Sequence, residues 1–96
     1  MSIVQQVHGA AGTIQLKLGG GQVRSIVGVA AGTSYTFQLK DGPDSAGNAR
    51  TIVGQNAAIP VVAGTQYMSP TFPIPFINGL QAVVTGTPGD FEVEFD

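Results

Sequence analysis

Few side chains in this 96-residue chain could carry out a reaction. The chain has one histidine, His8, and no cysteine, so a single copy can form neither a two-histidine metal site nor a thiolate nucleophile. No serine lies in a Gly-x-Ser-x-Gly motif, so a Ser-His-Asp triad would lack its usual nucleophile elbow. We expect His8 to lie at a surface or an interface. The sequence therefore predicts a protein that is not an enzyme and that has no catalytic residues, cofactor or metal site.

The clearest chemical pattern is acidic and lies at the end of the sequence. Four of the six acids alternate with apolar residues over 90–96. Because successive side chains of a strand point to opposite faces, this spacing predicts a strand with one acidic face and one dry face. The acidic face is either a solvated surface or a docking stripe for a basic surface on a neighbour. The acids of this candidate interface are Asp90, Glu92, Glu94 and Asp96.

A polar loop over residues 41–48 offers oxygen ligands from Asp41, Asp44 and Asn48. Calcium accepts such ligands, but position 52 is Ile where an EF-hand would require a bidentate Glu. Asp-Gly, Gly-Pro and Gly-Asn pairs are ordinary loop formers. The pattern favours a structural loop over a calcium site.

The elements that position these residues are predicted to be β-strands. Fourteen glycines and six prolines separate short runs rich in Val, Ile, Thr, Phe and Tyr, and no window keeps a helical period. About eight short strands at roughly ten-residue spacing predict an all-β fold, either a compact antiparallel sandwich or a jelly-roll-like barrel. We expect residues 1–96 to form a single β-domain, with residues 1–12 as an extended arm or an edge strand.

Two of these strands can be described in more detail. Ile14, Leu16 and Leu18 alternate with polar residues, so we expect them to share the dry face of a half-buried strand. The run 23–29 is apolar on much of both faces and is predicted to be central in its sheet. We interpret the three glycines at 19–21, between these strands, as a hairpin turn.

Two turns and a proline-rich segment complete the pattern. Asp41-Gly42 is expected to end a strand, and Asn78-Gly79 to supply the positive φ angles of a tight turn. In the segment 72–76 prolines occupy alternate positions, so every second backbone amide hydrogen is absent. This segment cannot be a central strand and is expected at a sheet edge or across a barrel mouth.

Charge is sparse, which excludes some partners and suggests others. Charged residues make up 10% of the chain, against a usual share of about 25%. The net charge of −2, without a basic run, lacks the footprint of a nucleic-acid binder. No apolar run approaches the ~20 residues of a membrane-spanning helix. We therefore expect neither nucleic acid nor a membrane as partner, and we expect neighbouring subunits to cover much of the surface.

Three short motifs lie in the second part of the chain: Phe-Gln-Leu-Lys-Asp-Gly at 37–42, Phe-Ile-Asn-Gly-Leu at 76–80 and Gly-Thr-Pro-Gly-Asp-Phe-Glu-Val at 86–93. Together they resemble small structural proteins of tailed-phage virions, in which Asp-Gly, Asn-Gly-Leu and glycine-rich turns punctuate the strands. Those proteins look like compact all-β proteins, some decorating or cementing the capsid and others serving in tails. The resemblance spans roughly residues 36–96. The residues carried over, as structural turn residues, are Asp41, Gly42, Asn78 and Gly79.

The resemblance implies a structural virion protein, most simply a capsid decoration or cement protein that binds the lattice as a homo-oligomer such as a trimer. Its partners would be the major capsid protein or other virion subunits, together with further copies of itself. Its location would be the virion, assembled in the host cytoplasm. The alternative is a phage tail-associated carbohydrate- or receptor-binding module. That alternative requires an exposed aromatic platform, for which Tyr35 and Tyr67 are the best candidates.

Overall fold

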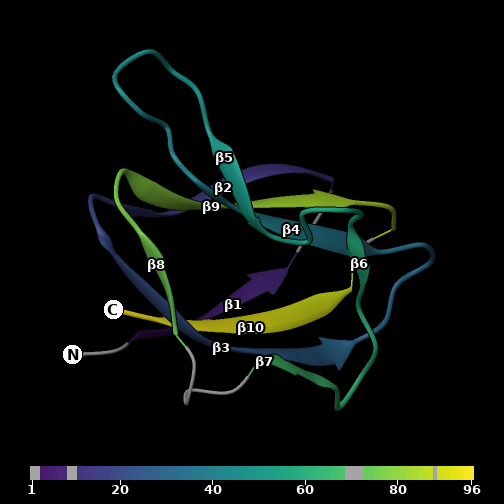
Figure 1. The fold of residues 1–96 in the computed structure, drawn as a ribbon. Coiled ribbons are helices and arrows are strands. Elements are labelled where there is room, and N and C mark those ends of the chain that lie inside the picture. Colours follow the sequence, from purple (N-terminus) through teal and green to yellow (C-terminus); the bar gives the residue numbers. More distant parts are fainter. Residues whose placement is uncertain (1–2, 9–10, 69–72, 88) are drawn as a thin grey trace.

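The computed structural model describes residues 3–8, 11–68, 73–87 and 89–96 (Figure 1). Within these residues the chain forms ten β-strands and no helix, so the all-β prediction is confirmed. The strands form two antiparallel five-stranded sheets, seen as the upper and lower layers of a sandwich in Figure 1. The strands are β1 (Ile3–His8), β2 (Gly12–Leu18), β3 (Gly21–Ala30), β4 (Thr36–Asp41), β5 (Arg50–Val53), β6 (Ile59–Pro60), β7 (Gln66–Met68), β8 (Ile74–Phe76), β9 (Gly79–Thr85) and β10 (Asp90–Phe95).

The chain passes repeatedly from one sheet to the other. Sheet A has the strand order β1-β10-β3-β7, with β8 also pairing with β3. Sheet B has the order β2-β9-β4-β5, with β6 also pairing with β4. Because β2 and β3 belong to different sheets, Gly19 and Gly20 link the two layers. The hairpin interpretation of this glycine-rich segment is therefore wrong.

The structure has two strands more than the eight expected. Residues 3–8 form β1, an edge strand of sheet A, which is one of the two forms predicted for the N-terminal segment. The second addition, β7, has three residues, too few for an alternating pattern to be recognised. The proline-rich segment lies at an edge as expected, since its described part, β8, pairs only with β3. Phe72, at the start of that segment, lies outside the described residues.

Aromatic rings from both sheets meet in the core. The rings of Phe37 on β4 and Phe91 on β10 stack with their centroids 4.6 Å apart. Phe91, Val93 and Phe95 are all buried, which confirms the dry face predicted for this strand. Burying a side chain of this size stabilises the fold by about 1.5–3 kcal/mol. Strand β10 is therefore a principal hydrophobic element of sheet A.

Bulges alter the alternation expected for two other strands. A register shift between Gln15 and Lys17 changes the facing of β2, so Leu18 is 75% exposed rather than on the dry face. In β3 a shift opposite the end of β10 lets Val23 and Ile26, three residues apart, both reach the core. Strand β3 pairs with β10 on one side and with β7 and β8 on the other. Its predicted central position is confirmed.

The turn between β8 and β9 forms where expected but by another mechanism. Neither Asn78 nor Gly79 has a positive φ, so the prediction that these two residues form a tight turn with positive φ angles is wrong. Instead, the buried carboxylate of Asp41, at the end of β4, accepts hydrogen bonds from the amides of Ile77 and Asn78 at 3.0 and 2.8 Å. Gly79 is needed for space, since a Cβ there would lie 2.6 Å from the carbonyl oxygen of Gly42.

Candidate functional site on the outer face of strand β10

Strand β10 lies inside sheet A, between β1 and β3. With its apolar side chains buried in the core, its acidic side chains face outward and are partly exposed. The neighbouring strands decide which of these acids are available. The two ends of the acidic stripe and its middle have different surroundings.

At one end of the stripe, Asp90 contacts the ring Nδ1 of His8 on β1. The His8 side chain is 67% exposed, so it lies at the surface as the sequence analysis expected. His8 and Asp90 are directly opposite each other in the last pair of the β1–β10 ladder. Asp90 is therefore engaged within the chain whenever His8 is protonated or donates from this nitrogen.

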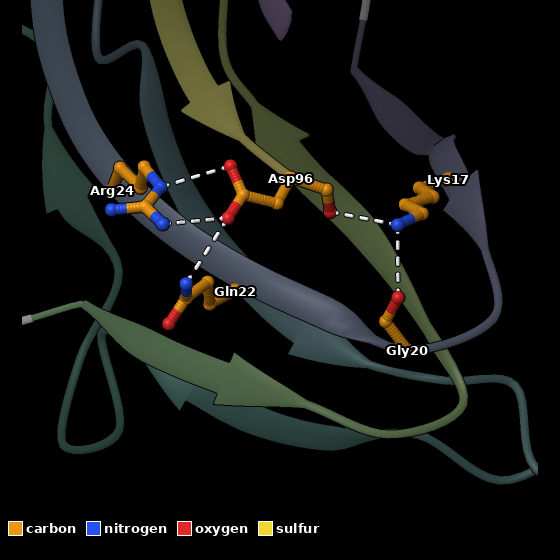
Figure 2. Close-up of polar contacts among 5 residues, drawn as sticks. All are labelled: Lys17, Gly20, Gln22, Arg24 and Asp96. Carbon is orange, nitrogen blue, oxygen red and sulfur yellow. Dashed lines mark hydrogen bonds and ion pairs between the residues drawn. The ribbon is translucent and has the colours of Figure 1, made fainter. Parts of the chain in front are cut away.

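At the other end, Asp96 is held by a fork of donors from β3 (Figure 2). Arg24 donates from Nε to Oδ1 at 2.9 Å and from Nη2 to Oδ2 at 2.7 Å, the bidentate arrangement that is strongest for this pair of groups. Gln22 donates to the same Oδ2 at 3.1 Å. The hydrogen bonds from Arg24 and Gln22 hold the pKa of Asp96 well below its ordinary range. Asp96 is thus an intramolecular anchor.

Lys17 links this end of sheet A to sheet B. Its Nζ donates to the main-chain oxygen of Asp96 and to the carbonyl oxygen of Gly20, each at 2.8 Å (Figure 2). The same Nζ lies 5.9 Å from the centroid of the Phe76 ring, within the range of a cation–π contact. Because Lys17 belongs to β2 in sheet B, it ties together the two layers where β10 ends.

Glu92 and Glu94 occupy the middle of the stripe, and we call them the glutamate pair. Glu94 lies beside Ser25 in the ladder, and its charge helps to raise the pKa of Arg24, after the larger effect of the hydrogen bond to Asp96. Glu92 lies between Gln6 on β1 and Val27 on β3. Among the described residues no cation forms an ion pair with Glu92. Of the four acids in the predicted interface, Glu92 therefore has no ion pair among the described residues, whereas Asp90, Glu94 and Asp96 each interact with a basic side chain on a neighbouring strand.

The polar loop after β4 forms one wall of a pocket of about 310 Å³. Its candidate ligand Asp44 uses Oδ1 to accept hydrogen bonds from the amides of Ala46 and Asn48, both at 2.9 Å. Asp41 uses its two oxygens for the turn before β9. Both carboxylates thus stabilise backbone, as the structural-loop interpretation expects. The pocket is lined by Asp41, Asp44, Asn48, Ala49, Arg50, Ile77 and Asn78.

The two tyrosines considered as sugar platforms are largely committed to the fold. Tyr35 is 2% exposed, so its proposed role as an exposed platform is wrong. Burial, and then the charge of Asp90, raise the pKa of Tyr35. Tyr67 stacks edge-on against Phe37 and donates its hydroxyl hydrogen to the carbonyl oxygen of Pro60 at 2.7 Å. Neither ring is positioned as a flat, open surface.

Comparisons with known proteins add no relative to this picture. No protein family, no curated protein and no solved structure matches the chain. In the part of the chain that the structure describes, no helix is long and apolar enough to cross a membrane. The resemblance to virion proteins accordingly stays a prediction.

Proposed function

We propose that the protein is a structural component of a phage virion, a capsid decoration or cement protein that binds the shell as a homo-oligomer. The observation that carries the proposal is the scarcity of charge on its surface. The chain exposes 4997 Å² and has 10 charged residues, about 500 Å² for each charge. Such a surface suits a protein whose neighbours cover much of it.

Internal pairing makes the available charge scarcer still. Asp41 is buried, while Asp96 and Arg24 neutralise each other. Asp90 contacts His8, and Lys17 is occupied by main-chain oxygens. The outer face of sheet A is therefore largely neutral, and the glutamate pair lies at its middle. That arrangement supports contact with a basic region of a shell subunit.

A repeating shell compensates for a small contact on each copy. Once one subunit of an oligomer binds, the others bind at a raised effective concentration, so weak individual contacts give firm attachment. The alternative of a tail-associated carbohydrate- or receptor-binding module has less support. Among the described residues the side chains of Tyr35 and of four Phe are buried, and that of Tyr67 is half-buried.

The proposal is tested by co-sedimentation of the purified protein with capsids assembled from the major capsid protein of the phage that would carry it. Replacing the glutamate pair in a Glu92→Gln/Glu94→Gln variant removes two negative charges without adding bulk. We expect this variant to bind at least tenfold more weakly than the wild type. The matched control, Thr13→Lys/Gln55→Lys, shifts the net charge equally at exposed residues outside sheet A and should bind as the wild type does.

Two outcomes would count against the proposal in different ways. If the glutamine variant binds as tightly as the wild type, the glutamate pair is not the contact. If the wild-type protein does not sediment with capsids at all, the capsid-decoration assignment itself is wrong.

A further inference from the structure

The two sheets have four edges, and three of them carry features that block pairing with another strand. The long edge β2 of sheet B is interrupted by a register shift between Gln15 and Lys17. The opposite edge is made of the short strands β5 and β6, and β6 ends in Pro60. In sheet A, the edge formed by β7 and β8 has three residues in each strand and contains Pro75.

The fourth edge, β1, has none of these features. Its register against β10 is unbroken from Ile3 to His8, and it contains no proline, glycine or lysine. Ile3 and Val4 are 54% and 61% exposed, among the large apolar side chains most open to solvent in the described chain. A regular edge strand with exposed apolar residues is a template for pairing with a further strand.

We infer that β1 pairs antiparallel with β1 of a second copy of this chain, so that two sheets A join into one continuous sheet. A two-fold axis through Gln5 sets Gln5 opposite the partner's Gln5, Ile3 opposite the partner's Val7, and Val4 opposite the partner's Gln6. This register keeps inward and outward side chains on their own faces, because paired residues differ by an even number of positions. It also sets the exposed Ile3 beside an apolar residue.

The chemistry of β1 favours a second copy as the occupant. A glutamine side chain can both donate to and accept from its own symmetry mate, so the centre of the pairing is self-complementary. The residues 3–7 are uncharged, so two identical strands approach without repulsion. In the joined sheet the two β10 strands lie three strand spacings apart, about 14 Å. This distance exceeds the Debye length of about 8 Å at physiological salt, so repulsion between the acids of the two copies is largely screened.

The acidic face makes another arrangement of two copies unfavourable. Stacking sheet A on sheet A would bring both glutamate pairs into one buried layer, where removing four carboxylates from water is costly. Pairing through β1 leaves both glutamate pairs on one open face. The inference rests on the self-association in the proposed function and gives it a geometry. The β1 contact itself can be tested in the absence of capsids.

Cysteine cross-linking tests the pairing directly, because the chain has no cysteine of its own. In a Gln5→Cys variant the two Cβ atoms across the axis would lie about 4.5–5.5 Å apart, a separation that a disulfide can close with small adjustment. On mild oxidation at micromolar concentration we expect a covalent dimer to form at least tenfold faster than in the control Thr13→Cys, whose residue lies exposed on edge β2. Equal rates in the two variants would overturn the inference.

Light scattering supplies an independent measurement. The wild-type protein should have twice the 9.8 kDa mass of one chain. Val4→Lys places a charged residue on the edge and should raise the dissociation constant of the dimer at least tenfold. The control Val62→Lys, at a valine that is 53% exposed against 61% for Val4 and lies away from β1, should not. A wild-type mass of one or three chains, or a Val4→Lys variant that stays dimeric, would overturn the pairing. Capsid co-sedimentation is scored separately, so a monomer that binds shells rejects the pairing alone.

Discussion

Two aspartates at the ends of strands perform the same task in opposite sheets. Asp41 ends β4 in sheet B and holds the turn before β9 through backbone amides. Asp96 follows β10 in sheet A and holds that strand's end through the side chains of Arg24 and Gln22. The Asp41 side chain is 4% exposed and that of Asp96 is 27% exposed. The two anchors therefore differ in partner type and in access to water.

This difference governs how replaceable each anchor is. Burial alone would raise the pKa of Asp41, but the amides of residues 77–79 and the nearby charge of Arg50 outweigh it and lower that pKa. Removing the charge there leaves backbone donors without a full partner at a nearly buried carboxylate, which is costly. At Asp96 water reaches both members of the pair, so solvent can substitute for part of what is lost. Similar hydrogen-bond geometry thus predicts unequal costs.

The largest effect is expected from Asp41→Asn. The new amide group would face a backbone N–H with a donor where the carboxylate had an acceptor, so we expect a loss of about 2–4 kcal/mol in the free energy of unfolding. Urea denaturation measures this loss. The matched control is Asp44→Asn, in the more exposed loop, where the remaining carbonyl oxygen can still accept from Ala46 and Asn48. Equal losses in the two variants would show that burial does not distinguish these sites.

Acid should weaken the fold through the same two groups. Both pKa values are lowered in the folded protein from an ordinary value of 3.8, so the unfolded chain binds protons more readily. Their contribution is complete above about pH 5 and is lost as the pH falls through the ordinary range and below it. We expect the urea midpoint to fall between about pH 5 and pH 2, and to fall less in Asp41→Asn. A midpoint independent of pH over this interval would contradict the role given to both carboxylates.

Local alternation predicted the strands well because it follows from the two-residue repeat of an extended chain. The buried Phe91, Val93 and Phe95 of β10 came from that repeat, and the central position of β3 came from apolar residues on both of its faces. The exceptions arose where partners changed the repeat. Leu18 became exposed because of a bulge against β9, and sequence alternation within β2 contains no sign of that bulge.

The roles of the acids were harder to predict because their partners are distant in sequence. Asp41 meets amides 36 and 37 positions away, and backbone donors are the same at every residue, so no motif marks them. Arg24 and Asp96 are 72 positions apart and meet only because β3 and β10 are neighbours. The strand order that joins them could not be read from the turns. The acidic alternation was visible in the sequence, but the partners of each acid were not.

The smallest effect is expected from Asp96→Asn, and salt should reveal its origin. The variant keeps an oxygen for one hydrogen bond but loses the charge that Arg24 contacts at 2.7 Å. We expect its urea midpoint to fall by less than that of Asp41→Asn, because the Arg24 and Asp96 side chains are already 33% and 27% exposed. The difference from wild type should shrink as sodium chloride rises from about 0.05 to about 0.5 M, since salt screens exposed charges. The corresponding difference for Asp41→Asn, which depends on buried backbone donors, should stay nearly constant. If salt instead reduced both differences equally, the two anchors would share one electrostatic mechanism, and partner type would not separate them.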